Sequence, residues 1–261
     1  MSRRSDAHWE RYGKEDPYYG VWVSGRFHAS NLSVEAKEEF FASGQQYIDF
    51  VKDAIRQHID IEFAPSVALD FGCGVGRLTI PLAQSFPKVI AVDVSPSMLQ
   101  ELKRNLKLRG LENVYAINAD DTLSGIKETY DLVISYNVFQ HIGVHRGEFI
   151  LRRLLDRLET GGVGALHFTY HRKASKARYA VHWTRKHLPF VNNLVNVVQG
   201  KPIDQPLMQW NNYNLNRIQL ILEEGGCGSV YIRPTGIDVN GHFGVILFFQ
   251  KVRLEPILLR E

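Results

Sequence analysis

The sequence predicts one large α/β domain built on a mixed β-sheet with helices on both faces. Short apolar segments alternate with helical patterns along most of the 261 residues, which is typical of βαβ units. A glycine-rich turn at residues 72–76 joins the first of these strands to a helix. The chain closes with two strand-like segments, residues 229–238 and 243–252, and the Asn240-Gly241 pair between them is a strong hairpin signal.

The composition is that of an ordinary globular protein, with 44% hydrophobic and 23% charged residues. No stretch approaches the roughly 18 consecutive apolar residues that cross a bilayer. Arg3 and Arg4 are followed by no apolar segment, so we expect no secretory signal. Cys73 and Cys227 are the only cysteines and form no disulfide framework, which favours the cytoplasm. The net charge of +3 is too small to indicate a nucleic-acid partner.

The glycine-rich turn is the most informative segment of the chain. A buried apolar run opens at Val67, and Gly72, Gly74 and Gly76 separate it from a helical pattern that begins at Leu78. A strand that enters a helix through such a turn leaves backbone N–H groups unpaired at the start of the helix. The turn therefore predicts a site for an anionic or strongly polar ligand.

The residues around the turn narrow the kind of ligand. Arg77 stands where the dinucleotide-binding fingerprint has its third glycine, and no Gly-Lys-Ser/Thr of a P-loop follows. Asp70 lies two residues before the first glycine, where a carboxylate would repel a pyrophosphate and attract an ammonium group. These features favour a zwitterionic ligand.

The segment from Asp70 to Gly76 resembles the first motif of class I S-adenosylmethionine-dependent methyltransferases, acid-x-Gly-x-Gly-x-Gly. The resemblance covers roughly residues 40–252. It implies a Rossmann-like seven-stranded mixed sheet with a C-terminal antiparallel hairpin, and S-adenosyl-L-methionine as the methyl donor. The terminal hairpin is typical of this class and not of nicotinamide dehydrogenases, which were the competing enzyme class.

The remaining elements follow in order along the chain. Ser33 starts a helix whose apolar stripe extends to Ile55, and Ser95-Pro96 starts another. A third helix runs through Leu158 until Gly161-Gly162 ends it. A fourth begins near residues 213–216. The predicted strands after the glycine turn are residues 88–92, 114–117, 131–136 and 163–170, before the terminal hairpin.

Several predicted strands end in residues suited to hold a cofactor. A carboxylate at the end of the second strand, here Asp93, can accept both hydroxyls of a ribose. The resemblance implies that Asp70 accepts from the methionine ammonium, directly or through water. It also implies that Asp120 accepts from the adenine, with Asp121 as the alternative if the register differs by one. The full set expected to bind cofactor is Asp70, Gly72, Cys73, Gly74, Gly76, Asp93, Val94, Met98, Asp120, Asp121, Ser135 and Asn137.

Other residues are candidates for the acceptor side of the site. His141 follows strand 131–136 at the expected ligand edge, where it would act as the general base or only order the loop. Residues 1–60 are expected to form a lid segment and a helix, although a flexible leader is the alternative. The core is expected at residues 61–252, with a tail at 253–261. Substrate-binding candidates are Tyr18, Tyr19, His167, Tyr170 and His171.

A basic insertion is expected at about residues 171–212. No Asp or Glu occurs from Thr160 to Ile203, whereas that span holds seven Lys and Arg residues. Three interpretations stay open: a solvated basic face, a cap that receives an anionic substrate, and an amphipathic segment at a membrane surface.

Missing motifs narrow the acceptor class. Residues 136–139 lack the Asx-Pro-Pro-aromatic motif of nucleic-acid amino methyltransferases, and the chain has no Pro-Cys nucleophile. The paired glutamates of protein-arginine enzymes and the Asp/Asn cluster that holds magnesium in catechol-type enzymes are also missing. These absences favour metal-independent O-methylation of a small or carrier-linked molecule, because His141 offers a base. N- or C-methylation and a non-catalytic cofactor binder with a basic interaction surface remain alternatives.

Overall fold

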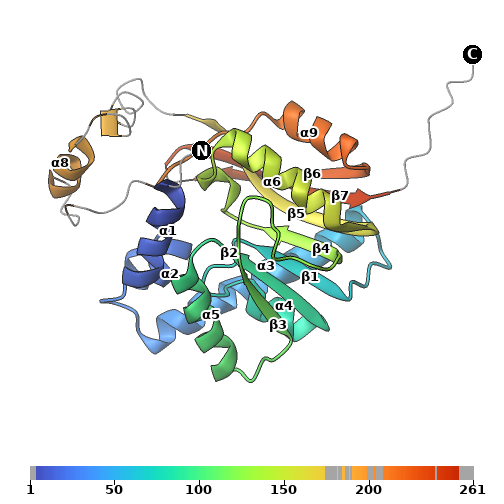
Figure 1. The fold of residues 1–261 in the computed structure, drawn as a ribbon, viewed down its shortest axis with the longest axis horizontal. Helices are drawn as coiled ribbons and strands as arrows, with labels where there is room; N and C mark the ends of the chain where they lie inside the picture. Colours follow the sequence, from blue (N-terminus) through green and yellow to red (C-terminus); the bar gives the residue numbers. More distant parts are fainter. Residues whose placement is uncertain are drawn as a thin grey trace, which may run out of the picture.

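The computed structural model describes residues 4–173, 181, 184–185, 188, 190–198, 203, 208–238 and 240–252. Its centre is a seven-stranded sheet in the order β3-β2-β1-β4-β5-β7-β6 (Figure 1). The strands are β1 (Val67–Phe71), β2 (Lys88–Asp93), β3 (Val114–Asn118), β4 (Tyr130–Ser135), β5 (Leu158–Arg172), β6 (Cys227–Ile237) and β7 (His242–Lys251).

Neighbouring strands from β3 to β5 pair in parallel, and β7 inserts antiparallel between β5 and β6. The predicted mixed sheet and terminal hairpin are confirmed. In the hairpin turn the Gly241 N–H donates to the Asp238 carbonyl at 3.0 Å, and Gly241 adopts a φ of +86°. Because β7 runs antiparallel, its first residue returns to the edge where the parallel strands end.

Helices cover both faces of the sheet (Figure 1). Side chains of α3 and α4 pack on one face, and α5 packs against the same side of β2; α6 and α9 pack on the other face. The helices are α1 (Arg4–Glu15), α2 (Pro17–Val21), α3 (Val34–His58), α4 (Thr79–Ser85), α5 (Pro96–Leu108), α6 (Val144–Arg157), α8 (Val191–Val198) and α9 (Leu215–Glu224), with short 3-10 helices η1 (Gly25–Phe27) and η2 (Phe139–His141).

The two helix starts predicted from serine caps are confirmed. Ser33 Oγ accepts from the Ala36 N–H at 3.2 Å, and Ser95 Oγ accepts from the Met98 N–H at 3.1 Å. Pro96 occupies the first turn of α5, where no N–H is needed. Each cap satisfies one N–H that the first turn would otherwise leave unpaired.

The prediction that a helix continues through Leu158 is wrong. Helix α6 ends at Arg157, and Leu158 pairs with Tyr130 as the first residue of β5. Leu158 is buried in the core, so its side chain stabilises the strand that begins there. Gly161, with a φ of +87°, lies inside β5 and does not terminate the helix.

Helix α3 approaches the glycine-rich turn very closely at Gly44. A Cβ at this position would lie 1.9 Å from the backbone oxygen of Arg77, the residue that follows the turn. The missing side chain therefore lets α3 support the turn from behind.

We expect Gly44→Ala to destabilise the fold by about 1–3 kcal/mol, because the added methyl overpacks this contact. Helix propensity alone predicts the opposite sign, since alanine is favoured over glycine in a helix. Gly25→Ala is the control, because nothing lies within 4 Å of its added Cβ. Thermal melting compares the two variants, and a Gly44→Ala protein as stable as the wild type would contradict the packing argument.

Candidate functional site

A cavity of about 550 Å³ opens along the edge of the sheet where the parallel strands end. Its walls come from the loops after β1, β2, β3 and β4, from the end of β5 and from the start of β7. Helices α1 and α2 also contribute to the wall. The predicted site residues that line the cavity are Tyr19, Gly72, Gly74, Asp93, Val94, Met98, Asp120, Asn137 and His141.

The glycine turn forms one wall of the cavity, and it tolerates no side chain. Gly72 and Gly74 have φ values of +78° and +53°. A Cβ on Gly72 would lie 2.4 Å from Val138, and one on Gly74 would lie 2.5 Å from Val21 of α2. The turn therefore exposes bare backbone to the cavity, as the sequence predicts.

Asp93 ties the turn to the end of β2. Its carboxylate accepts from the Gly74 N–H at 2.8 Å and from the Ser95 N–H at 2.9 Å. Burial raises the pKa of the Asp93 carboxyl, although these backbone donors oppose the shift. Asn137, after β4, also lines the cavity and adopts a φ of +61°, a conformation that asparagine tolerates better than most residues.

Asp70 lies behind the turn and does not line the cavity. Its carboxylate accepts from Thr79 Oγ1 at 2.6 Å, at the start of α4. Burial raises the pKa of Asp70 to about 6, against the opposing effects of Thr79 and Arg77. Asp70 is therefore not among the residues that line the cavity, and its contact with the methionine ammonium, directly or through water, stays a prediction.

Four other predicted cofactor residues lie outside the cavity lining: Cys73, Gly76, Ser135 and Asp121. The Cys73 thiol is buried, and burial raises its pKa well above the ordinary value. A Cβ on Gly76 would lie 2.5 Å from Leu102 of α5, so this glycine serves packing. Ser135 Oγ donates to the Phe71 carbonyl at 2.9 Å and links β4 to β1.

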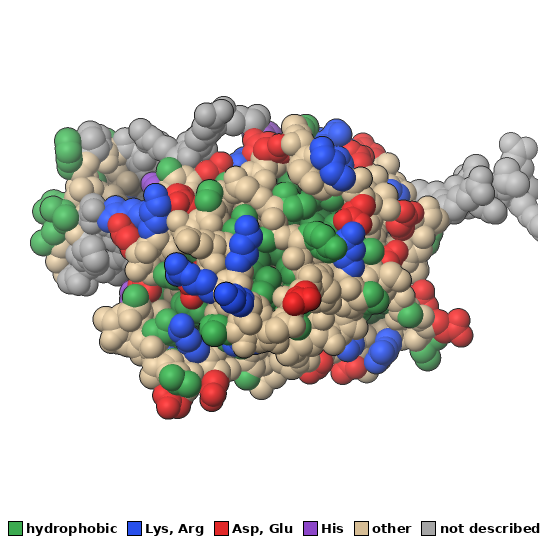
Figure 2. Space-filling model, turned by 60° about the horizontal axis from the view of Figure 1, so that its bottom comes forward, with side chains coloured by type: hydrophobic (Ala, Val, Ile, Leu, Met, Phe, Trp, Pro, Cys, Tyr) green, Lys and Arg blue, Asp and Glu red, His purple; other side chains and the backbone are tan. Residues whose placement is uncertain are grey.

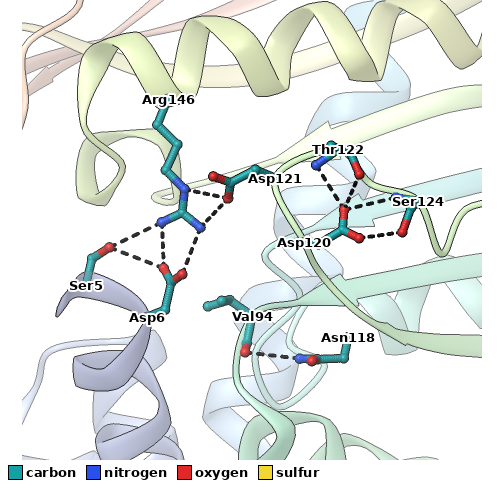
Figure 3. A network of polar contacts seen from close by, with 9 residues as sticks. All are labelled: Ser5, Asp6, Val94, Asn118, Asp120, Asp121, Thr122, Ser124 and Arg146. Carbon is teal, nitrogen blue, oxygen red and sulfur yellow. Dashed lines mark hydrogen bonds and ion pairs between the residues drawn. The ribbon is translucent and has the colours of Figure 1, made fainter. Parts of the chain in front are cut away.

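The two aspartates after β3 have different surroundings (Figure 3). Asp120 lines the cavity, but its carboxylate accepts from the side chains of Ser124 and Thr122 and from their N–H groups, which hold its pKa well below the usual range. Asp121 accepts from Arg146 Nε at 2.7 Å. Asp120 Oδ1 accepts three of its four hydrogen bonds, whereas both contacts of Asp121 with Arg146 involve Oδ1.

Helices α1 and α2 lie across the cavity, held by two polar contacts. Arg146 of α6 donates to the Asp6 carboxylate at 2.6 and 2.9 Å while it also pairs with Asp121 (Figure 3). Glu10 accepts from Ser95 Oγ at 2.8 Å and from Ser97 Oγ at 2.7 Å at the start of α5. Although burial raises the pKa of Glu10, these hydrogen bonds lower it below its ordinary value.

Of the three tyrosines predicted to bind substrate, Tyr18, Tyr19 and Tyr170, only Tyr19 lines the cavity. Its ring stacks on His28 with centroids 3.8 Å apart. Tyr18 is buried against α5, with its hydroxyl 2.9 Å from Glu101 Oε1 and 3.0 Å from Asn105 Oδ1. Tyr18 therefore anchors α2 to the core and does not reach a ligand.

His141 lines the cavity as a neutral imidazole. Its Nδ1 lies 2.7 Å from the Gln209 carbonyl, so Nδ1 carries the proton and Nε2 is the acceptor. The Gln140 side-chain amide lies 3.3 Å from Nε2. Burial lowers the pKa of His141 to about 4, so it is a weak base.

A second histidine, His242, lines the cavity and was not among the predicted site residues. Its Nδ1 lies 3.1 Å from the Asp238 carboxylate, and its buried Nε2 has no hydrogen-bond partner. Its ring stacks on the Trp210 ring with centroids 4.2 Å apart. The His141 ring also contacts Trp210, edge to face, with centroids 5.1 Å apart. Burial lowers the pKa of His242, and the Asp238 charge opposes that shift.

A signal for this pair exists in the sequence. Asp238 and His242 flank the predicted Asn240-Gly241 turn, and an antiparallel last strand must begin at the edge where the parallel strands end.

The remaining substrate-binding candidates lie away from the cavity lining. His167 is buried beside Tyr136, with ring centroids 5.0 Å apart. Tyr170 and His171 lie against Phe243, and Tyr170 is exposed. Arg172, the last residue of β5, reaches the cavity instead, because a register shift near Thr169 changes which strand residues face it.

The basic insertion is described only in part. Arg185 and Asn196 line the cavity. Lys176, Arg178, Lys186 and Lys201 lie outside the described residues. Among the helices that the structure describes, none has the length and apolar character needed to cross a membrane.

Comparison with known proteins supports the interpretation of this fold. Residues 68–162 match a family model described as "Methyltransferase domain". Ubiquinone biosynthesis O-methyltransferase of Methylocella silvestris is 29% identical over 106 residues, which cover 36% of this chain and 41% of that protein. Malonyl-[acyl-carrier protein] O-methyltransferase of Anoxybacillus flavithermus is 37% identical over 78 residues, 29% of each chain. The chain thus spans less than half the length of these relatives.

Among solved structures, magnesium protoporphyrin IX methyltransferase from Synechocystis PCC 6803 with bound SAH (S-adenosylhomocysteine) superposes over 95% of this chain and 99% of its own. The TM-score is 0.62 at 18% sequence identity, so this similarity concerns the fold. Residues 68–162 thus match a methyltransferase domain, and the chain as a whole shares the fold of this S-adenosylhomocysteine-binding methyltransferase.

Proposed function

We propose that this protein transfers a methyl group from S-adenosylmethionine to a small or carrier-linked acceptor, with an oxygen atom as the favoured nucleophile. The observation that carries the proposal is the glycine turn, which opens with Asp93 onto a cavity of about 550 Å³. A cavity of this size falls within the range of small-molecule sites. The relatives that are O-methyltransferases support the oxygen acceptor, whereas (S)-coclaurine N-methyltransferase of Thalictrum flavum keeps nitrogen as the alternative.

The residues present fit this cofactor. The side-chain-free backbone at Gly72 and Gly74 would lie along its methionine portion, because a Cβ at either position would need space that neighbouring side chains already occupy. Asp93 would accept the ribose hydroxyls at the end of β2. Met98 and Val94 would lie beside the adenine. Asp70 would act only from behind the turn, through the field of its carboxylate or through water.

Bound S-adenosylmethionine supplies a methyl group that its sulfonium already activates. The chain must therefore align the acceptor, exclude water and remove the proton of an acceptor hydroxyl. Trp9 and Tyr12 of α1 lie over the cavity and would exclude water during the transfer. We assign removal of this proton to a histidine, because His141 and His242 both line the cavity.

Two histidines can accept that proton. His141 is the residue that the sequence predicts, but the nearby Gln140 amide and the low pKa weaken it as a base. His242 has a free Nε2, and Asp238 would stabilise the imidazolium that forms. His242, paired with Asp238, is therefore the stronger candidate for the base, and His141 is the second candidate.

Asp93→Asn should weaken binding of S-adenosylhomocysteine by about tenfold to a hundredfold, because hydrogen bonds to a charged group are worth about 1.5–3 kcal/mol. Isothermal titration calorimetry measures this change. Asp49→Asn, an exposed carboxylate on α3, is the matched control and should bind normally. Equal dissociation constants for both variants would remove the ribose assignment.

Replacing the base should lower methyl transfer by about a hundredfold while cofactor affinity stays unchanged. The assay is transfer of labelled methyl from S-adenosylmethionine into fractionated metabolites, with His242→Ala, His141→Ala and the surface control His58→Ala compared. Absence of transfer by the wild type into any fraction, together with normal cofactor binding, would favour the non-catalytic binder.

Asp238→Asn separates the two bases. Loss of the carboxylate lowers the pKa of His242, so the acid limb of the kcat–pH profile should move to lower pH if His242 is the base. If the acid limb of the kcat–pH profile does not move, another group removes the acceptor proton, and His141 is the next candidate.

We also infer that α1 and α2 act as a lid that Arg146 holds closed. Arg146→Met should raise hydrogen exchange in residues 4–15 by about tenfold, because Asp6 loses its cation. Arg152→Met on the same helix removes an exposed pair with Glu224 and is the control. Equal exchange in both variants would show that other contacts hold the lid.

A further inference from the structure

Helix α8 presents its hydrophobic side chains to solvent and its polar side chains to the interior. Leu194 and Val198 are 67% and 81% exposed, and Val197 lies with them on the face that residues three and four apart share. Asn196, on the opposite face, is only 1% exposed. A helix at the surface of a globular protein normally has the reverse arrangement. Figure 2 shows hydrophobic side chains on the surface at α8, at the left of the molecule.

Hydrogen bonds hold α8 in this orientation. Arg185 Nη2 donates to the side-chain oxygens of Asn192 and Asn196, each at 2.9 Å. The Asn196 amide also donates to the Ile203 carbonyl at 3.3 Å. Rotation of the helix to bury its apolar face would break these bonds and leave a guanidinium without its acceptors. The apolar face is therefore directed outward by the chain's own contacts.

The charge of the surrounding segment indicates what covers this face. The segment of residues 160–203, which contains α8, carries seven Lys and Arg residues and no Asp or Glu. Two copies of such a segment repel each other, so a second copy of this chain is disfavoured as the partner. An anionic surface attracts it, and a bilayer also accepts exposed aliphatic side chains at its headgroup boundary. Exposed Phe190, directly before the helix, adds a large apolar side chain.

We propose that α8 is a docking face for the surface of an anionic phospholipid bilayer. Leu194, Val197 and Val198 enter the boundary between headgroups and acyl chains, and the positive charge that residues 160–203 carry in the sequence attracts the anionic headgroups. Because Asn196 and Arg185 line the cavity on the inner side of α8, docking brings the cavity close to the bilayer. This interaction goes beyond the proposed methyl transfer and is tested independently of it.

The test is co-sedimentation of the full chain with phosphatidylcholine vesicles that contain either no anionic lipid or about 30% phosphatidylglycerol. We expect binding to the anionic vesicles, loss of that binding at high salt, and at least tenfold weaker binding by the Leu194→Asp/Val198→Asp variant. The matched control is Ile61→Asp/Leu108→Asp, which places the same charges on two side chains that are each 80% exposed elsewhere. Equal thermal melting of the variants shows that both fold.

Other outcomes overturn the proposal. No vesicle binding by the wild type, or equal binding by the α8 and control variants, removes α8 as a docking face. A wild-type dimer in sedimentation equilibrium that only the α8 variant dissociates assigns the face to a second copy. Binding of S-adenosylhomocysteine, measured in the same preparations, reports on the proposed function separately, since the α8 variant should retain it.

Discussion

The site depends on a stretch of backbone without side chains where three elements meet. At Gly74 the N–H donates to Asp93 at the end of β2, and the place that a Cβ would occupy is filled by Val21 of α2. At Gly72 the corresponding space is filled by Val138 after β4. Any side chain at these two positions would push apart the strand ends, the covering helix and the cavity wall together.

The helices that cover this turn are attached in a different way from the core. Tyr18 and Val21 of α2 pack into the protein, and α1 buries Tyr12 but is also held by polar contacts, from Glu10 to the start of α5 and from Asp6 to Arg146. Polar contacts of this kind open at a smaller cost than a packed core, because water can replace each partner. Such an attachment suits a segment that must admit a ligand and then close over it.

The acceptor side of the cavity is rich in neutral aromatic and imidazole rings. Burial lowers the pKa values of His141 and His242, so both are uncharged near pH 7. Trp210 lies between them, in contact with each ring. A site that stays uncharged until it takes up a proton suits removal of a proton from a neutral hydroxyl, and Asp238 provides the charge that would compensate it.

The sequence by itself determined the succession of strands and helices along the chain, the terminal hairpin, the serine caps and the glycine turn. These features follow from local rules, because the spacing of apolar residues, the capping of a helix and the conformational freedom of glycine each depend on a few neighbouring residues. Only the tertiary structure decided that Asp70 accepts a hydrogen bond from Thr79 and that Asp121 pairs with Arg146. It also decided that His242 lines the cavity. Those outcomes depend on partners 9 and 25 residues away or on the direction of a distant strand, which no local pattern contains. The outward apolar face of α8 is of the same kind, because the alternation of Asn and Val does not tell which side Arg185 will hold.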